Sequence, residues 1–299
     1  MIDTLHKTST TVQNALREAR GLLSAQGIES SPLEAELLLR QVLEVRKEDL
    51  ILHSDEALTE LQEEHFRQLV QRRCRKEPLA YITGRREFWS LDFTVNPNVL
   101  IPRPETEGLI ERMLELAGGG ARDAALRVLD VGTGSGILAV VAALEFPQAW
   151  ITAVDCSADA LAVTRDNALR HQVAERIELL LMDMMKPWNL KDSGPYDFIL
   201  SNPPYIPSRE MERLMPDVRD YEPRAALEGG LDGLACYRRL IPNAFDYLKP
   251  EGHLIVEVGD GQAEPVAQKL QAHSGFEEIK IIQDLSGKGR VVSAKRAHG

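Results

Sequence analysis

The feature that most constrains the fold is a regular alternation of strand-like and helix-like segments from residue 126 onward. Such alternation is typical of a mostly parallel sheet that is covered by helices on both faces. Only a short turn, residues 286–289 (Ser-Gly-Lys-Gly), separates the last two strands, so we expect an antiparallel pair at one edge. The predicted fold class is therefore α/β, with a doubly wound, seven-stranded sheet. Its strands are expected at residues 127–131, 150–155, 177–182, 196–201, 252–258, 278–283 and 290–294.

The first part of the chain has a different pattern, in which apolar residues such as Leu16, Ala19 and Leu23 recur at helical spacing. Capping boxes at residues 31–34 (Ser-Pro-Leu-Glu) and 59–62 (Thr-Glu-Leu-Gln) mark two expected helix starts. A short stretch with period-two alternation follows and predicts a β-hairpin connector. We therefore expect a small all-α bundle at residues 1–85, a β-hairpin connector at 86–104 and the α/β domain at 105–299.

The composition indicates which ligands and which cellular compartment suit the protein. An apolar fraction of 43% is ordinary for a globular chain, and a formal charge of −11 gives no broad basic face for nucleic acid. Cys74, Cys156 and Cys236 are far apart, so neither a disulfide framework nor a zinc site is indicated. The N-terminus lacks the apolar core of a signal peptide, and the apolar run at 137–144 is too short to span a bilayer. We expect a cytoplasmic protein.

A short basic cluster, formed by Arg72, Arg73, Arg75 and Lys76, ends the helical region. We interpret it as a solvated helix end, because basic side chains interact favourably with the carboxyl end of a helix dipole. A docking patch for an acidic or RNA-containing partner is the alternative.

A glycine-rich turn, Gly132-x-Gly134-x-Gly136, lies between an expected strand and an expected helix, directly after Asp130. Glycines in such a turn let the chain bend sharply and let a ligand approach the backbone closely. Asp155 ends the next strand, where a carboxylate can bond both hydroxyls of a ribose. Asp130 is expected to support the turn from beneath.

Three interpretations of this turn are open. NAD usually requires Gly-x-Gly-x-x-Gly, and the third glycine here comes one residue too early. S-adenosylmethionine carries no phosphate and needs a close glycine turn, an acid for its ribose and an acceptor for its adenine amine. Asp183, which ends the third strand, is placed for that last task. A purely structural turn that binds no ligand is the third possibility. Asp155 and Asp183, the acids at the strand ends, favour an S-adenosylmethionine site over a purely structural turn.

Residues 202–205 (Asn-Pro-Pro-Tyr) directly follow the strand expected at 196–201. Two consecutive prolines restrict the backbone, and because neither has an N–H, nearby carbonyls stay free to accept hydrogen bonds. Asn202 adds a side-chain acceptor and Tyr205 adds an aromatic face. The combination is suited to holding a planar –NH2 group, and an ordinary proline-rich turn is the alternative.

Together with residues 130–136 (Asp-Val-Gly-Thr-Gly-Ser-Gly), this loop resembles the class I methyltransferases that modify planar amines. Further motifs resemble the release-factor glutamine N5-methyltransferases (HemK type) specifically. These motifs are Pro-Leu-Ala-Tyr-Ile-Thr-Gly at 78–84, Ile-Pro-Arg-Pro-Glu-Thr-Glu at 101–107, Tyr-Glu-Pro at 221–223 and Glu-Val-Gly at 257–259. The resemblance runs from about residue 77 to residue 292, and the helical region is similar in kind. The related family that methylates a ribosomal-protein glutamine resembles the chain less at residues 103–106.

The resemblance implies methyl transfer from S-adenosyl-L-methionine to the side-chain amide N5 of the glutamine in the Gly-Gly-Gln motif of a peptide chain release factor. S-adenosyl-L-homocysteine would be the other product. Methylation of a ribosomal-protein glutamine and N6-adenine methylation of DNA are alternatives, and a catalytically silent binding module is another. We expect a monomer that needs no metal and binds no membrane and no nucleic acid directly. The helical region is expected to dock the release factor.

The resemblance also implies roles for individual residues. Asn202 and Pro203 would accept the two amide N–H bonds through the Asn202 side-chain oxygen and the Pro203 carbonyl, and Tyr205 would pack against the amide plane. Pro204 and Arg103 complete the expected substrate-binding set. The expected cofactor-binding residues are Gly132, Thr133, Gly134, Ser135, Gly136, Asp155, Asp183, Met184 and Asn202.

Further expectations concern the surroundings of this site. Met184 stands where some relatives carry an aromatic residue, and its side chain can still cover the adenine ring. Arg103 would otherwise be a surface charge that pairs with Glu105. Glu257, at the end of a buried strand, is interpreted as a structural acid satisfied by backbone N–H groups. Residues 206–231 are expected to form a substrate lid, with a disordered surface loop as the alternative.

Overall fold

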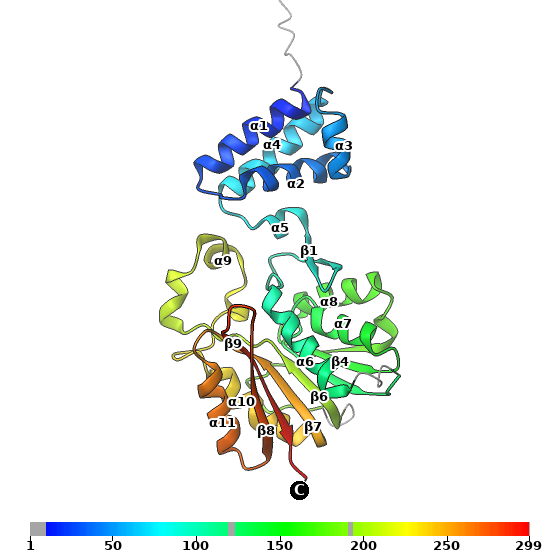
Figure 1. Ribbon diagram of the computed structural model, residues 1–299, viewed down its shortest axis with the longest axis vertical. Helices are drawn as coiled ribbons and strands as arrows, with labels where there is room; N and C mark the ends of the chain where they lie inside the picture. Colours follow the sequence, from blue (N-terminus) through cyan, green and yellow to red (C-terminus); the bar gives the residue numbers. More distant parts are fainter. Residues whose placement is uncertain (1–9, 119–122, 191–193, 299) are drawn as a thin grey trace, which may run out of the picture. The chain divides into compact units, whose positions relative to one another are not determined.

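The computed structural model describes residues 10–118, 123–190 and 194–298. These residues divide between Gly84 and Arg85 into two compact units (Figure 1). Within the described ranges, the first unit contains helices joined by loops, and the second is built on a sheet. No helix in these ranges is long and apolar enough to cross a membrane.

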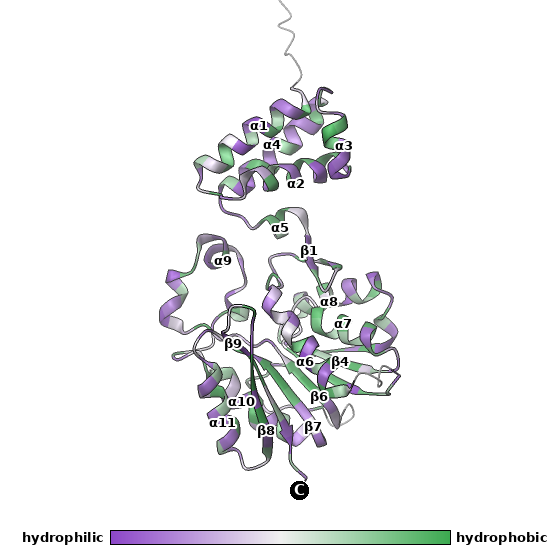
Figure 2. Ribbon diagram, in the orientation of Figure 1, coloured by the Kyte–Doolittle hydropathy of each residue, from purple (hydrophilic) through white to green (hydrophobic). Residues whose placement is uncertain are grey.

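The first unit is a bundle whose helices bury apolar side chains against one another, as the sequence predicted. Leu23, Leu38 and Phe66 are among the buried residues of its core. Hydrophobic and hydrophilic residues alternate around these helices (Figure 2), as expected where one helix face lies on a core. Within residues 10–84 the helices are α1 (Val12–Ala25), α2 (Ser31–Leu43), α3 (Lys47–Leu52), α4 (Glu60–Cys74) and α5 (Leu79–Thr83).

The two expected capping boxes differ in outcome. The box before α4 is present, because Thr59 Oγ1 accepts from the Gln62 N–H at 3.3 Å and Gln62 Oε1 accepts from the Thr59 N–H at 2.9 Å. The box predicted at residues 31–34 is wrong, since α2 already begins at Ser31. Its proline falls in the first turn of the helix as expected. Glu34, the last residue of that box, has a different task.

Glu34 forms an ion pair with Arg73, which is the one buried residue of the basic cluster Arg72, Arg73, Arg75 and Lys76, all of which lie in the described part of the chain. The Arg73 Nε atom lies 2.5 Å from the Glu34 carboxylate, and both side chains are about nine-tenths buried. Arg72 makes two contacts with the Glu77 carboxylate, at 2.9 and 2.5 Å. Two of the cluster's charges therefore stabilise the bundle itself, and Arg73 is not the solvated side chain that the sequence suggested.

The second unit contains a seven-stranded sheet with the order β5-β4-β3-β6-β7-β9-β8, which confirms the predicted fold class. β9 runs antiparallel to both of its neighbours, whereas the other pairings are parallel. The antiparallel strand β9 is therefore the second strand from the edge, and β8 is the edge strand. The strands are β3 (Arg127–Val131), β4 (Trp150–Asp155), β5 (Ile177–Leu181), β6 (Tyr196–Ser201), β7 (Leu248–Glu257), β8 (Phe276–Gln283) and β9 (Gly289–Arg296).

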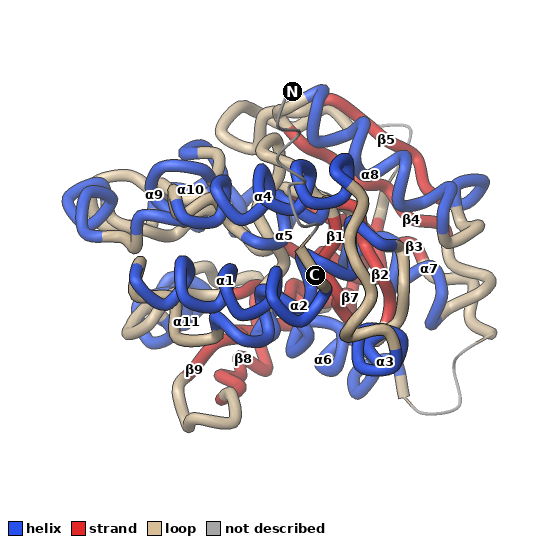
Figure 3. Tube along the Cα trace, turned by 90° about the horizontal axis from the view of Figure 1, so that it is seen from above, coloured by secondary structure: helices blue, strands red, loops and turns tan. Residues whose placement is uncertain are grey.

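Helices cover both faces of this sheet (Figures 1 and 3), and successive strand residues serve the two faces in turn. In β3, Val128 belongs to the core beneath α6, α7 and α8, whereas Leu129 belongs to the core beneath α10 and α11. The helices are α6 (Glu107–Ala117), α7 (Ile137–Glu145), α8 (Ala158–Arg170), α10 (Ala235–Tyr247) and α11 (Ala263–Ala272).

A β-hairpin precedes the sheet, as predicted, and consists of β1 (Arg85–Phe88) and β2 (Leu91–Thr94). Asn167 of α8 fixes its end. The Asn167 Oδ1 atom accepts from the Thr94 N–H at 2.7 Å, and Nδ2 donates to the carbonyls of Thr94 and Ser135 at 2.9 and 2.8 Å. The hairpin is thereby attached to the glycine-rich turn. A short 3-10 turn, η1 (Pro104–Thr106), then leads into α6.

The long segment after β6 is ordered, so its interpretation as a disordered loop is wrong. It contains η3 (Ser208–Arg213), α9 (Pro216–Tyr221) and η4 (Arg224–Ala226). It returns to its own start, because the Ile206 N–H donates to the Leu227 carbonyl at 2.9 Å. The returning part lies beside the loop at residues 202–205 and forms one wall of the cavity described next.

Candidate active site

A cavity of about 790 Å³ lies at the carboxyl ends of β3, β4 and β6, where open α/β sheets bind their ligands. The connector and the segment that ends in Gly230 complete its wall. Four of the expected site residues do not line this cavity, namely Gly136, Pro203, Tyr205 and Arg103. The expected site residues that do line it are Gly132, Thr133, Gly134, Ser135, Asp155, Asp183, Met184, Asn202 and Pro204.

The glycine-rich turn presents its backbone to this cavity. Gly132, Gly134 and Gly136 have φ angles of +76°, +58° and +81°, a region that favours glycine. A Cβ atom added at Gly134 would meet no atom within 4 Å, so the backbone there faces open space. A Cβ atom at Gly136 would lie 2.6 Å from Thr164 Cγ2, so that glycine is required for close packing against α8. The turn is both tight and accessible.

The two strand-end acids are held by backbone N–H groups. Asp155 accepts from the Gly134 N–H through Oδ2 and from the Ser157 N–H through Oδ1, both at 2.9 Å. Asp183 accepts from the Met185 N–H at 2.9 Å. Both side chains remain part-exposed on the cavity wall, and each carboxylate oxygen has a second lone pair for a ligand.

Met184 provides the apolar part of the same wall. Its methyl carbon lies 3.4 Å from the position of a Cβ atom at Gly132, so the side chain reaches across to the glycine-rich turn. One cavity therefore combines an open glycine backbone, one acid for a ribose, a second acid for an amine and an adaptable thioether. These residues fit S-adenosylmethionine.

Asp130 lies beneath the turn and not on the cavity wall. Its carboxylate is fully buried and accepts from the Thr133 hydroxyl at 2.7 Å. Burial raises the pKa of Asp130 to about 7, and the Thr133 hydrogen bond works in the opposite direction. Asp130 is therefore a support for the loop residue Thr133.

The Asn-Pro-Pro-Tyr loop is fixed by side chains from three other segments. The Asn202 Nδ2 atom donates to Thr106 Oγ1 at 3.1 Å. Within the ranges that the structure describes, no group donates to Asn202 Oδ1. The Tyr205 hydroxyl donates to Glu257 at 3.3 Å, and the Tyr205 carbonyl accepts from Gln262 Nε2 at 2.9 Å.

The members of this loop differ in their access to the cavity. Asn202 and Pro204 line it, whereas Pro203 is buried behind the wall. The Tyr205 ring packs against the core beneath α10 and α11. The structure thus brings Asn202 together with the cofactor-binding residues, and it gives Tyr205 a packing role behind them.

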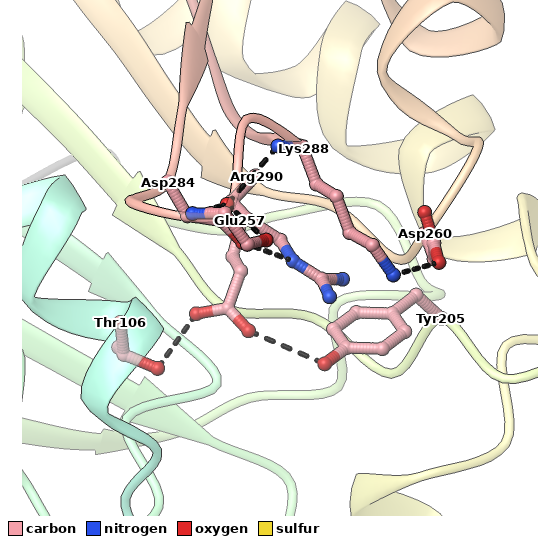
Figure 4. A network of polar contacts seen from close by, with 8 residues as sticks. Thr106, Tyr205, Glu257, Asp260, Asp284, Lys288 and Arg290 are labelled. Atoms are coloured by element: carbon pink, nitrogen blue, oxygen red, sulfur yellow. Dashed lines mark hydrogen bonds and ion pairs between the residues drawn. The ribbon is translucent and has the colours of Figure 1, made fainter.

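Glu257 is the centre of the polar network in Figure 4, and sequence reasoning assigned it the wrong partners. Its carboxylate is 2% exposed and accepts from two hydroxyls, Thr106 at 2.6 Å and Tyr205 at 3.3 Å, in place of backbone N–H groups. Burial raises the pKa of Glu257 to about 7, and both hydroxyl hydrogen bonds work in the opposite direction. Sequence reasoning also missed Thr106, whose only signal was its place in the motif at residues 101–107.

Arg103 pairs with Glu222 and not with Glu105. The Arg103 guanidinium lies 2.5 Å from the Glu222 carboxylate, whose side chain is 1% exposed. The same carboxylate accepts from the Ile101 N–H at 3.1 Å. This contact ties the segment before η1 to the end of α9, and it occupies the guanidinium that was expected to contact substrate.

The sheet order with one antiparallel strand and the cavity at the strand ends define a class I methyltransferase. Two solved structures share this fold. A methyltransferase from Pyrococcus furiosus aligns with a TM-score of 0.50 and 19% identity over 71% of this chain and 91% of its own. The hMettl16 catalytic domain aligns with a TM-score of 0.54 and 16% identity over 73% and 80%.

Closer relatives identify the family. A release factor glutamine methyltransferase from Geobacter sulfurreducens is 42% identical over 95% of this chain and 96% of its own. One from Nitratidesulfovibrio vulgaris is 41% identical over 96% and 95%. Residues 14–84 match the PrmC N-terminal domain, and residues 109–216 match the methyltransferase small domain. The chain belongs to the release factor glutamine methyltransferase family, as its motifs predicted.

Proposed function

We propose that this protein transfers the methyl group of S-adenosyl-L-methionine to the side-chain amide N5 of the glutamine in the Gly-Gly-Gln motif of a peptide chain release factor. The orientation of Asn202 carries the proposal. Its Nδ2 atom donates to Thr106, so its Oδ1 atom is left to accept from a substrate amide in the same cavity as the glycine-rich turn. The relatives at 41–42% identity are release factor glutamine methyltransferases, which supports the choice of substrate.

We assign the cofactor side of the cavity to the residues that fit it. The Gly134 backbone would lie against the amino-acid part of S-adenosyl-L-methionine, Asp155 would accept from the ribose hydroxyls, and Asp183 would accept from the adenine amine. Met184 would cover the adenine ring. The bound cofactor supplies an electrophilic methyl group on a positively charged sulfur.

The acceptor side has to activate a weak nucleophile. A carboxamide nitrogen is a poor nucleophile because its lone pair is delocalised into the carbonyl. Asn202 Oδ1 would accept one of its two N–H bonds, which orients the nitrogen and stabilises the charge that develops on it. The Pro203 carbonyl was expected to accept the second N–H, but Pro203 does not line the cavity. The carbon–nitrogen bond forms as the carbon–sulfur bond breaks, positive charge passes from sulfur to nitrogen, and the nitrogen then loses one proton to water. S-adenosyl-L-homocysteine leaves as a neutral thioether.

One labelling experiment tests the reaction against its alternatives. The full chain is incubated with methyl-labelled S-adenosyl-L-methionine in four parallel reactions that differ in the acceptor. The acceptors are a release factor, the same factor with alanine in place of the motif glutamine, ribosomes and DNA. We expect label on the unchanged release factor alone, located to the motif glutamine by mass spectrometry. Label on a ribosomal protein or on DNA would replace this proposal with one of the alternatives, and no label at all would indicate a binding module.

We also propose that the helical unit docks the release factor, that the chain acts as a monomer and that it works in the cytoplasm. The match of residues 14–84 to a domain of this family supports the first point. Removing residues 1–84 should raise the KM for the release factor while cofactor affinity, measured by calorimetry, stays unchanged. An unaltered rate on the protein substrate would contradict the docking role. Light scattering of the full chain tests the monomer.

A further inference from the structure

A continuous line of hydrogen bonds joins Glu257 to the proposed substrate acceptor. Glu257 at the end of β7 accepts from the Thr106 hydroxyl at 2.6 Å, and Thr106 Oγ1 accepts from Asn202 Nδ2 at 3.1 Å. Figure 4 shows Glu257 between Thr106 on one side and Tyr205 on the other. Thr106 is fully buried and Glu257 is 2% exposed, so water does not compete for these positions.

The chemistry of the groups gives this line a direction. An ionised carboxylate can only accept hydrogen bonds, so the Thr106 hydroxyl must donate its single proton to Glu257. The lone pairs of the same hydroxyl oxygen can then only accept. Asn202 must therefore turn its amide nitrogen toward Thr106 and its carbonyl oxygen the opposite way.

We propose that Thr106 and Glu257 are positioning residues for the methyl transfer, and that they fix the Asn202 carboxamide with Oδ1, and not Nδ2, toward the substrate amide. This inference rests on the proposed function. A glutamine amide nitrogen presents two N–H donors, so a flipped Asn202 would meet it with donors and could not orient it for transfer. We call this hydrogen-bonded line, from Glu257 through Thr106 to Asn202, the relay. It selects the one orientation of Asn202 in which the side-chain oxygen can accept from the substrate.

The relay predicts a pH dependence, because its direction requires an ionised Glu257. Burial and the negative charge of Glu105 raise the pKa of Glu257 to about 7, while Arg290 on β9 and the Tyr205 hydroxyl lower it. From α10, Tyr237 faces the same residue and donates to its backbone carbonyl at 2.8 Å. Glu257 is thus ionised above about pH 7 and protonated below it.

Protonation removes the selection. A neutral Glu257 can donate to Thr106 Oγ1, and the Thr106 proton is then free to turn toward Asn202. Either face of the Asn202 carboxamide can pair with Thr106 in that state. The rate of transfer should therefore be low below about pH 7, where Glu257 is protonated, and should rise as the pH passes through about 7. This rise is the acidic limb of the pH profile.

Thr106→Val and Thr106→Ser form the matched pair that tests the relay. Valine keeps the shape of the buried side chain and removes its hydroxyl, whereas serine keeps the hydroxyl. We expect Thr106→Val to lower kcat on the release factor by about 10²-fold, the effect of misplacing a reacting group. KM for the release factor and cofactor affinity should change little, and the acidic limb of the pH profile should disappear. Thr106→Ser should restore most of kcat together with that limb.

Tyr205→Phe tests the other contact of Glu257. Phenylalanine keeps the ring and removes one of the two hydroxyls that stabilise the ionised carboxylate. The relay through Thr106 stays intact, so we expect the acidic limb to remain and to move to higher pH. An acidic limb that stays at its native pH in Tyr205→Phe would show that Glu257 does not set it, and would overturn the inference.

The remaining outcomes separate the relay from the proposed function. A Thr106→Val variant with native kcat and pH profile on a release factor that the native chain methylates would overturn the relay alone. An equal fall in kcat for the Val and Ser variants would reduce Thr106 to packing and would also overturn it. If the native chain labels another substrate, the proposed function fails, and the same pair of variants on that substrate still decides the relay.

Discussion

The two sides of the cavity are built in different ways. On the cofactor side, Asp155 accepts from the Gly134 N–H, a contact between residues only 21 positions apart and made to the backbone. On the acceptor side, Thr106 contacts Asn202 and Glu257 over 96 and 151 positions, and both contacts are between side chains. The cofactor side thus depends on local backbone geometry, whereas the acceptor side depends on the direction of side-chain hydrogen bonds.

This difference predicts that the two sides can be damaged separately. A cofactor gripped by backbone and strand-end acids should lose affinity when those residues change. A substrate amide oriented by Asn202 should lose rate at saturating cofactor when the acceptor side changes. A single substitution that affects both quantities equally would erase the distinction.

The largest expected effect is that of Asn202→Ala. Removing the acceptor that stabilises developing charge should lower kcat by about 10²- to 10³-fold, since the substrate nitrogen is then neither oriented nor supported. The affinity for S-adenosyl-L-methionine, measured by calorimetry, should stay within a few-fold of the native value. Full activity of the variant would show that Asn202 is not the acceptor, and a lost cofactor affinity would show that the two sides are one unit.

The second expectation compares two glycines of one turn. Gly136→Ala combines a left-handed backbone with a Cβ atom 2.6 Å from Thr164 Cγ2, so it should lower the free energy of unfolding by about 2–4 kcal/mol. Gly134→Ala has the left-handed backbone alone and should cost about 1–2 kcal/mol. Because its added methyl group points into the cavity, Gly134→Ala should also weaken cofactor binding. Urea unfolding and calorimetry measure both quantities, and equal unfolding costs would refute the assignment of Gly136 to packing.

The same contrast explains what the sequence could predict. The bounds of β3, β4 and β6 coincide with the expected strands, because hydrophobic runs and glycine turns act over a few residues. The glycine-rich turn and Asp155 were found for the same reason. The partners of Glu257 and Arg103 were wrong, because they are supplied by Thr106 and Glu222 from segments more than 100 positions away. Which side chains meet at such distances is decided by the packing of the whole sheet, which no local pattern contains.

The capping box predicted at residues 31–34 failed on the same ground. Ser31 and Glu34 have the right spacing for a box, but a helix start is a competition between local and distant partners. Glu34 lies 39 positions from Arg73 and pairs with it in the bundle core. In the structure the Glu34 carboxylate accepts from the Arg73 guanidinium and from the Ser30 hydroxyl, so its partners are side chains and not the backbone N–H that a capping box requires.

The last expectation concerns the cofactor side alone and is that of Asp155→Ala. Losing a charged acceptor for the ribose should weaken S-adenosyl-L-methionine binding by about 1.5–3 kcal/mol, or about 10- to 150-fold in Kd. kcat at saturating cofactor should fall far less than in Asn202→Ala, because the acceptor side is untouched. Asp155→Asn is the control, since it keeps an oxygen for the Gly134 N–H and should lie between the native chain and the alanine variant. Unchanged affinity in Asp155→Ala would contradict the ribose assignment, whereas a loss of kcat as large as that of Asn202→Ala would show that the glycine-rich turn also positions the substrate.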